Sequence, residues 1–366
     1  MKIVFICGAA EPGKDGVGDY VRLLAASLVH SGHSAFIVSY NDRYIQEKRT
    51  ETQQCLGAEI TVLRLPRTAS DQERFSDAKS FVKDISPDWI SLQFVPFSYH
   101  EKGLSNTLAA HFATLAPGTK KHIMFHELWV GMDTQSPLKL KLWGRIQKWY
   151  IKKLLRTVKP DVIHTHSQVY QAQLGILGFT AKLLPLYSNI PVVYEPAGTD
   201  QNLDAVVFGN IHFGGNTHLF AQWLKTTAEN TGRIPHFHFI GNTGAQAQVW
   251  KESLTNAGVQ YTDHGLCEPD YISAVLSKCT LGVASTPYLL TEKSGSVSAM
   301  LEHGLPVVAV AREWTPIEKP TRAVNALQVI NWMPETSLNT ILKAKQPAFN
   351  GVSVITERFK NDLNLQ

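Results

Sequence analysis

Short apolar segments alternate with helix-like segments along nearly the whole chain, and this alternation restricts the possible folds most strongly. The apolar segments of the first half are KIVFIC, SAFIVSY, EITVLRL, WISLQFV, HIMFHE and DVIHTHS. A segment between the first two, GDYVRLLAASLVHSG, carries its apolar side chains at helical spacing. Such alternation predicts parallel β-sheets with helices on their faces.

A turn-rich segment, SNIPVVYEPAGTDQN (188–202), interrupts the alternation, which then starts again. A chain of 366 residues is also about two domains long. We therefore predict two Rossmann-like, doubly wound domains, 1–190 and 191–348, and a C-terminal helix in 349–366 that returns to the first domain. Facing each other, such domains enclose a cleft, and ligands are expected in the loops beyond the carboxyl ends of the strands.

Composition argues against several classes of protein. The 4 cysteines form no Cys-x-x-Cys pair, which argues against a zinc site or a disulfide framework and is typical of a reducing cytosol. No segment is long and apolar enough to span a bilayer, and the start, MKIVFICGAAEPG, favours a buried strand over a signal peptide. The net charge of +4 comes without a basic tail, which argues against nucleic-acid binding. We expect a cytoplasmic protein.

The segment TEKSGSVSAMLEHGLPVVAV (291–310) predicts a helix whose start is suited to an anion. Ser294, Gly295 and Ser296 begin this helix, and the N–H groups of a first turn, with the helix dipole, favour a diphosphate. Lys293 adds a full positive charge. A helix that is capped by serine and binds no ligand explains these residues equally well.

The first loop, KDGVGDYV, brings Gly16 and Gly18 before a helix. A dinucleotide fingerprint needs a third glycine there, so a nicotinamide cofactor is not expected. Asp19 either faces a ligand or simply favours the helix N-terminus by its charge.

Taken in order, these segments resemble the retaining glycosyltransferases of family 4, which have the GT-B fold. GAAEPGKDGVGDYV is similar to the opening loop of that family, FHELW to its His-Asp or His-Glu loop, VVFGNI and FHFIGNTG to the first strands of its second domain, and 291–310 to its donor-binding segment. The resemblance covers most of the chain. It implies the transfer of a hexose from a nucleotide-diphosphate sugar to an acceptor, with retention and without a metal or other cofactor.

The resemblance also implies residue roles. His126 lies where the family places a histidine against the donor sugar, so His126 and Glu292 are the implied catalytic residues. His164 and His166 are spaced like a metal pair, but the family position implies a strand end without a metal. The implied donor-binding residues are Gly18, Gly209, Asn210, His212, Gly241, Asn242, Lys293, Ser294, Gly295, Ser296, Ser298 and Glu302. The implied acceptor residues are Asp19, Tyr20, Gln93 and His100.

The donor segment departs from the family pattern. Family members usually have two glutamates separated by seven residues at the start of this helix, and these positions are Thr291 and Ala299 here. Either Ser298 or Glu302 would then bind the ribose hydroxyls, or neither residue would.

The loop after VVFG reads GNIHFGGN, with His212 in place of the basic pair that is usual in the family. Lys293 is the implied substitute cation. Two alternatives therefore stay open: a GT-B-like protein that binds a sugar or nucleotide without catalysis, and, less well matched, a nucleotide-sugar epimerase.

The segment 138–159 predicts a basic amphipathic helix. One face carries Lys141, Arg145, Lys148, Lys152, Arg156 and Lys159, and the other carries Leu138, Leu142, Ile146, Trp149, Leu154 and Val158. This pattern is typical of a helix at an anionic membrane surface, here the inner face of the membrane, and equally of a solvated helix packed on a sheet. The acceptor stays open among a glycan, a lipid-linked sugar and a small molecule.

Overall fold

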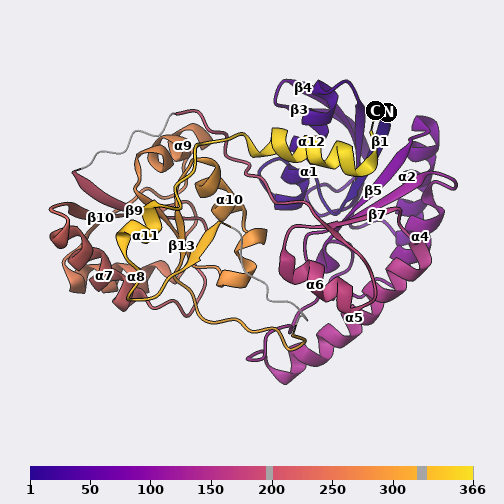
Figure 1. Cartoon of the computed structure of the whole chain (residues 1–366). Coiled ribbons are helices and arrows are strands. Elements are labelled where there is room, and N and C mark those ends of the chain that lie inside the picture. Colours follow the sequence, from indigo (N-terminus) through magenta and orange to yellow (C-terminus); the bar gives the residue numbers. More distant parts are fainter. Residues whose placement is uncertain (195–200, 320–327, 366) are drawn as a thin grey trace. The chain divides into compact units, whose positions relative to one another are not determined.

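The computed structural model describes residues 1–194, 201–319 and 328–365 and contains two α/β units (Figure 1). The first unit comprises Met1–Pro185, Thr315–Arg322 and Val352–Gln366, and the second comprises Leu186–Trp314 and Ala323–Gly351. Each unit is built on one mainly or entirely parallel sheet with helices packed against it. The predicted fold class, two doubly wound α/β units, is confirmed.

The sheet of the first unit has eight strands in the order β3-β4-β2-β1-β5-β6-β7-β8. The strands are β1 (Lys2–Cys7), β2 (Ser34–Asp42), β3 (Arg49–Cys55), β4 (Ala58–Pro66), β5 (Trp89–Phe94), β6 (Lys120–Phe125), β7 (Val162–Thr165) and β8 (Lys182–Leu183). All six residues of β5 are buried, as expected for a strand covered on both faces. The edge strand β3 pairs antiparallel with β4.

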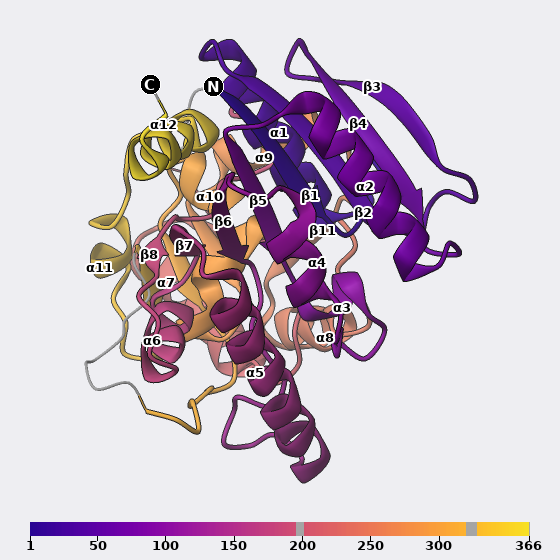
Figure 2. The same cartoon turned by 90° about the vertical axis from the view of Figure 1, so that its right-hand side faces the viewer.

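The helices of the first unit are α1 (Gly16–His30), α2 (Asp71–Ile85), α3 (Pro96–Tyr99), α4 (Leu108–Leu115), α5 (Leu138–Val158), α6 (Gln168–Ile176) and α12 (Gly351–Leu363). Figure 2 shows α2, α4 and α5 following one another along this unit. The C-terminal helix α12 packs on the same sheet, because the fully buried ring of Phe359 lies 6.1 Å from that of Phe5.

The sheet of the second unit has six strands in the order β11-β10-β9-β12-β13-β14. The strands are β9 (Asn202–Phe208), β10 (Ile234–Ile240), β11 (Gln260–Asp263), β12 (Leu281–Ala284), β13 (Val307–Ala309) and β14 (Val329–Asn331), and all their pairings are parallel. The helices are α7 (Thr217–Asn230), α8 (Ala247–Ala257), α9 (Pro269–Lys278), α10 (Gly295–Glu302) and α11 (Leu338–Leu342), and the 3₁₀ helix is η1 (Tyr288–Lys293). Buried aromatic rings, with Phe220 and Trp250 among the largest, fill the core on one side of the sheet.

The structure shows which side of α5 is packed against the rest of the first unit. Leu154 and Val158 are buried, whereas four apolar residues in the first three turns point outward. Their exposed fractions are 71% for Leu138, 49% for Leu142, 49% for Ile146 and 57% for Trp149. The first half of α5 therefore presents an apolar stripe to the outside, and we call these four residues the α5 stripe.

Two residues explain why the first half of α5 packs on its other side. Gly144 has no side chain, and a Cβ there would collide with the carbonyl oxygen of Val130, so the helix approaches the backbone closely. The buried amide of Gln147 accepts a hydrogen bond from the N–H of Val130 at 2.9 Å and donates one to the carbonyl of Lys102 at 3.2 Å. A glycine and a satisfied amide thus form the packed face in the first half of α5.

No helix in the described residues combines the length and apolarity required to cross a bilayer.

Candidate functional site

Strand order places one candidate site in the second unit. The connections run outward from β9 in one direction, through β10 to β11, and then return to β12 on the other side of β9. Where the order reverses in this way, the loops after the two central strands separate and leave a crevice that binds ligands in open α/β sheets. Here those loops are 209–216, after β9, and 285–294, after β12.

Glycines allow the loop after β9 to lie against the start of α10. Gly209 has φ 79°, and a Cβ there would lie 2.7 Å from the Oγ of Ser296. A Cβ at Gly244, in the loop after β10, would lie 2.8 Å from the Oδ1 of Asn210. Gly241 also has a positive φ, of 85°, and Asn242 beside it is exposed. The segments VVFGNI and FHFIGNTG therefore end in glycine turns, which meet at this edge of the sheet.

His212 and Lys293 come from the two loops that flank the crevice. The N–H of His212 donates to the Oγ of Ser285 at 3.0 Å, which ties the loop after β9 to the loop after β12. Burial, and then the positive charge of Lys293, lower the pKa of the His212 imidazole. Near neutral pH His212 is therefore an uncharged hydrogen-bonding group beside a cation.

Helix α10 begins as the sequence predicts. Ser294 is its N-cap, and the side-chain oxygen of Ser294 accepts the N–H of Val297 at 3.4 Å. Gly295 is exposed at the first helical position, with Ser296 after it. The N–H groups of these two residues have no partner within an α-helix, and the positive end of the helix dipole lies there. This arrangement is suited to an anionic group such as a diphosphate.

Two predicted ribose-binding residues are occupied within the protein. The hydroxyl of Ser298 donates to the carbonyl oxygens of Leu186 and Ser294 at 3.1 and 3.2 Å. Glu302 is buried, and its two oxygens accept the N–H groups of Ser188 and Gly351. Burial raises the pKa of Glu302 to about 7 despite these two hydrogen bonds. Both side chains therefore form hydrogen bonds within the second unit that stabilise it.

In the first unit, His126 follows β6 and belongs to a buried group of side chains. The Nε2 of His126 lies 2.9 Å from the Oε1 of Gln93, and its Nδ1 lies 2.8 Å from the Nε2 of His166. The Nδ1 of His166 in turn lies 2.9 Å from the carbonyl oxygen of Leu184. The ring of Tyr20 packs edge-on against both imidazoles, at 4.9 and 5.3 Å. His126 is therefore held on three sides in one orientation.

The contacts continue from Gln93 to the C-terminal helix. The amide nitrogen of Gln93 donates to the hydroxyl of Ser91 at 2.7 Å, and that hydroxyl lies 2.7 Å from the Nδ1 of His122. The Nε2 of His122 lies 3.0 Å from the Nδ1 of His164, whose Nε2 lies 3.0 Å from a carboxylate oxygen of Asp362. A continuous chain of polar groups thus joins His126 to α12 through the core.

This series of polar contacts lacks one hydrogen when its histidines are neutral. Seven contacts link the carbonyl of Leu184 to the carboxylate of Asp362, and each requires one hydrogen. Four neutral imidazoles, one hydroxyl and one amide N–H supply six.

Burial lowers the pKa of all four imidazoles, to about 4 for His164 and for His166. Burial alone would raise the pKa of Asp362, but hydrogen bonds from Lys182 and His164 lower it, so this carboxylate is ionised. At neutral pH one contact in the chain therefore lacks its hydrogen, and His126 is uncharged.

His164 and His166 contact other side chains and do not contact each other. His164 contacts His122 and Asp362, whereas His166 contacts His126. Across the described ranges, no group of three or more His, Cys, Asp or Glu residues is arranged to hold a metal ion.

The predicted acceptor residues occupy different environments. Asp19 accepts the N–H of Gly13 at 3.0 Å and forms an ion pair with Arg22, so it stabilises the first loop. Gln93 and Tyr20 are buried in the group around His126. His100 is exposed, and its Nδ1 accepts N–H groups of its own turn. Gly18 lies in the first turn of α1, where a Cβ would meet the carbonyl oxygen of Ala9 at 2.5 Å.

A polar pocket of about 160 Å³ marks the switch point of the first unit, between β1 and β5. It is lined by Gly8, Ala9, Asp15, Asn41, Arg43, Arg67, Phe97 and Ser98. Asn41 lies at the end of β2, and the others follow strands β1, β2, β4 or β5. Sequence reasoning missed the two arginines, although their position just after predicted strands was a signal that could have identified them.

No protein-family model and no curated protein matches this sequence. Several solved structures share its fold over the full length. The apo form of the lipopolysaccharide outer core galactosyltransferase WaaB aligns with 100% of this chain and 98% of its own, at a TM-score of 0.52 and 14% identity. The catalytic domain of starch synthase IV from Arabidopsis thaliana, bound to ADP and acarbose, covers 100% and 99%, at a TM-score of 0.54 and 11% identity.

An E. coli structure described as trehalose-6-phosphate bound with UDP-2-fluoro glucose covers 100% and 99%, at a TM-score of 0.52 and 10% identity. At such low identity these likenesses concern the fold alone. They confirm that the chain has the GT-B fold.

Proposed function

We propose that this protein is a glycosyltransferase that moves a sugar from a nucleotide-diphosphate sugar to an acceptor. The observation that carries the proposal is the switch-point site of the second unit, where Lys293 and His212 flank the start of α10. The fold adds support, because solved structures with this fold include proteins described as a galactosyltransferase and a starch synthase. The resemblance to family 4 supports retention of the anomeric configuration and a hexose as the transferred sugar.

In this proposal the diphosphate binds the N–H groups of Gly295 and Ser296, with the ammonium of Lys293 on its oxygens. The loop from Gly209 to His212 and the turn at Gly241 and Asn242 cover the rest of the donor. The charge of the diphosphate is then met by a cation and a helix dipole, so we propose that the reaction needs no divalent metal. Activity that persists in excess chelator is the expected result.

His126 and Glu292 are the proposed catalytic residues. The hydrogen bonds around His126 fix the orientation of its imidazole, as the support of a reacting sugar requires. A neutral imidazole stabilises hydroxyl groups or a developing charge by hydrogen bonding.

We propose that the acceptor binds in the first unit, at its switch-point pocket. The reaction is placed in the cytoplasm, with peripheral contact between α5 and an anionic membrane.

The competing function is a binding protein without transferase activity. Its supporting observation is that Ser298 and Glu302 are both occupied by internal hydrogen bonds, with Ala299 between them. Release of nucleoside diphosphate from UDP-, ADP- and GDP-sugars, measured with and without candidate acceptors, separates the two. Turnover that disappears in Lys293→Ala supports the transferase, whereas nucleotide binding without turnover of any donor supports the binding protein.

A further inference from the structure

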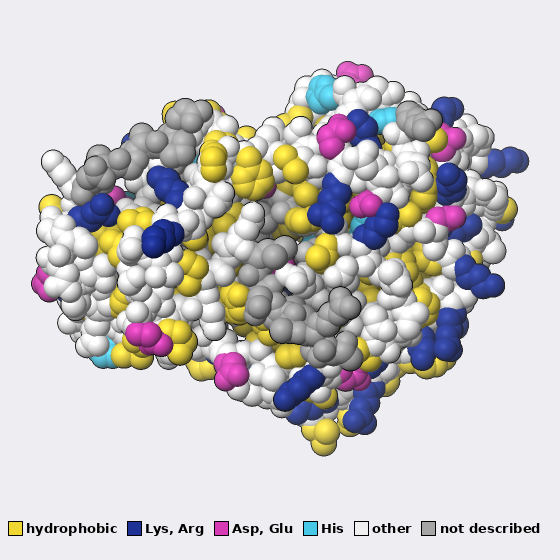
Figure 3. Space-filling model, in the orientation of Figure 1, with side chains coloured by type: hydrophobic (Ala, Val, Ile, Leu, Met, Phe, Trp, Pro, Cys, Tyr) yellow, Lys and Arg dark blue, Asp and Glu magenta, His cyan; other side chains and the backbone are white. Residues whose placement is uncertain are grey.

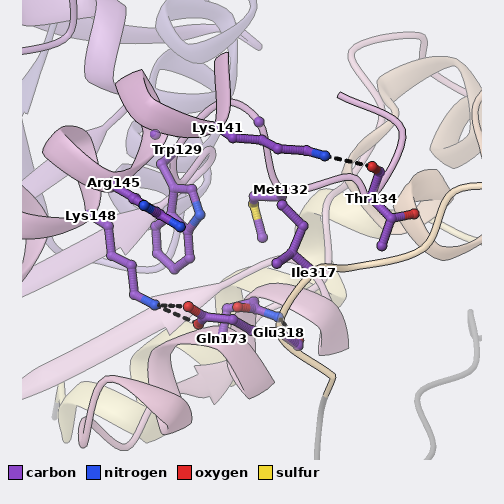
Figure 4. Close-up of a pocket in the computed structure, with 11 residues that line it drawn as sticks. Trp129, Met132, Thr134, Lys141, Arg145, Lys148, Gln173, Ile317 and Glu318 are labelled. Atoms are coloured by element: carbon purple, nitrogen blue, oxygen red, sulfur yellow. Dashed lines mark hydrogen bonds and ion pairs between the residues drawn. The ribbon is translucent and has the colours of Figure 1, made fainter. Parts of the chain in front are cut away.

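A pocket of about 310 Å³ lies beside α5 in the first unit (Figure 4). One wall is formed by α5 itself, and the others by the segment after β6, by Gln173 of α6 and by the returning segment at Ile317 and Glu318. Trp129, Met132 and Ile317 contribute apolar surface. The volume is within the range of small-molecule sites.

The lining of this pocket has an excess of positive charge. Lys141, Arg145 and Lys148 project from α5, whereas Glu318 is the one acidic residue among the described lining residues. Lys148 pairs with Glu318 and lies 5.3 Å from the ring centre of Trp129. Among the residues that the structure describes, Lys141 and Arg145 therefore have no carboxylate partner.

These two cations are available to a ligand. The ammonium of Lys141 donates one hydrogen bond, to the carbonyl of Thr134 at 2.7 Å, and keeps two further N–H groups. Within the described ranges, the guanidinium of Arg145 forms no hydrogen bond or ion pair. A planar guanidinium next to an ammonium is suited to a phosphate group, which both can contact at once.

The α5 stripe borders this pocket on the same helix. Arg145 follows Leu142 by three residues and precedes Trp149 by four, so it lies between the pocket and the stripe. Beyond the stripe, the ammonium of Lys153 lies 5.5 Å from the ring centre of Trp149. Figure 3 shows Lys and Arg side chains interspersed with hydrophobic ones along the lower right margin, where Figure 1 shows α5.

We propose that this pocket binds the phosphate group of an anionic membrane lipid while the α5 stripe enters the interfacial layer of the membrane. An apolar stripe that ends in Trp and has basic residues beside it is the composition of a helix that lies in the membrane interface. Positive charge complements an anionic bilayer. A second copy of the chain is a poor partner, because a two-fold interface on α5 would bring its cations together.

This inference deepens the membrane contact that is part of the proposed function, and it uses no residue of the donor site. Its test can therefore fail while nucleotide binding is retained. The measurement is co-sedimentation of the full chain at low salt with phosphatidylcholine vesicles that lack or contain phosphatidic acid.

Two matched pairs of substitutions distinguish the pocket from general charge. Lys141→Gln with Arg145→Gln removes the two pocket cations, and Lys139→Gln with Lys159→Gln removes the same charge from α5 and its C-cap outside the pocket. We expect the pocket pair to weaken binding to phosphatidic acid vesicles by about tenfold or more, and the control pair to weaken it less. Leu142→Gln is expected to weaken binding to the same vesicles with all cations in place.

Four results would overturn the proposal. Equal losses in the two pairs would show diffuse attraction without a pocket. Thermal stabilisation by inorganic phosphate that is lost in the pocket pair, without vesicle binding, would assign the pocket to a soluble phosphate compound. Absence of vesicle binding with normal nucleotide affinity would refute the membrane contact and leave the transferase proposal intact. Binding of acidic proteins, without binding of vesicles, would assign α5 to a protein partner.

Discussion

Replacing Glu302 by Gln separates a structural carboxylate from a ligand-binding one. Glu302 is buried, its oxygens accept two backbone N–H groups, and burial raises its pKa from 4.5 to about 7. A side chain used in this way stabilises the second unit and is not free to hold ribose hydroxyls. We therefore expect Glu302→Gln to change the pH dependence of stability but not the affinity for a nucleoside diphosphate.

The magnitude follows from the difference in pKa between folded and unfolded chains. The unfolded chain releases the proton of Glu302 near pH 4.5, whereas the folded chain keeps it until about pH 7. Folding is therefore unaffected below pH 4.5 and loses stability as the pH rises between these values. A pKa difference of this size corresponds to about 3 kcal/mol. Glutamine does not titrate, so the free energy of unfolding of the wild type relative to Glu302→Gln should fall by that amount between pH 4.5 and pH 8.

Urea unfolding at several pH values measures this difference, and Glu335→Gln, at an exposed glutamate of the same unit, is the matched control. Comparison with the variant cancels the histidines, whose lowered pKa values act in the opposite direction. A difference between wild type and Glu302→Gln that stays constant from pH 4.5 to pH 8 would refute the reasoning. A loss of nucleotide affinity in this variant would return Glu302 to the donor site.

Two further substitutions test the first unit. His126→Ala leaves His166 and Gln93 without their partner, so we expect about 1–3 kcal/mol of destabilisation. At a temperature where the variant is folded, donor turnover should still fall far more than in His122→Ala. Equal losses of turnover in the two variants would make His126 a structural residue. Gly144→Ala places a methyl group against the carbonyl of Val130, so we expect α5 to be displaced and protease cleavage within 138–158 to increase. The control is Gly175→Ala, which should not change cleavage because a Cβ has open space there.

The alternation of segments allowed the fold class to be predicted because strands buried on both faces require continuous apolar runs. The same rule missed β3, whose sequence RTETQQC is polar and suited to an edge. It also missed β8 and β14, which have only 2 and 3 residues. The packed side of the first half of α5 was not predicted, because Gly144 and Gln147 pack by close approach and hydrogen bonding, which a hydrophobic pattern does not record.

The candidate site was predictable to the level of its loops. The segment around Lys293 was identified from the predicted helix start in 291–310, and the segment around Gly209 from the resemblance to family 4. Both segments follow strands beside a switch point, where ligand-binding loops are expected. The environments of Glu302 and Gln93 were not predictable, because Ser188, Gly351 and His126, which contact them, are distant in sequence. The arginines of the first-unit pocket were missed because Arg43 and Arg67 belong to no motif, although both lie just after predicted strands.

The most direct test of the proposed function is calorimetric titration of UDP, ADP and GDP into the wild type and into Lys293→Ala. We expect at least one nucleoside diphosphate to bind the wild type, and Lys293→Ala to weaken that binding by about 1–3 kcal/mol, the range for a lost charge-assisted hydrogen bond. Lys225→Ala, at a surface pair with Glu229 in the same unit, should bind like the wild type. Affinity that is unchanged in Lys293→Ala, or no binding of any of the three by the wild type, would contradict a donor site at the start of α10.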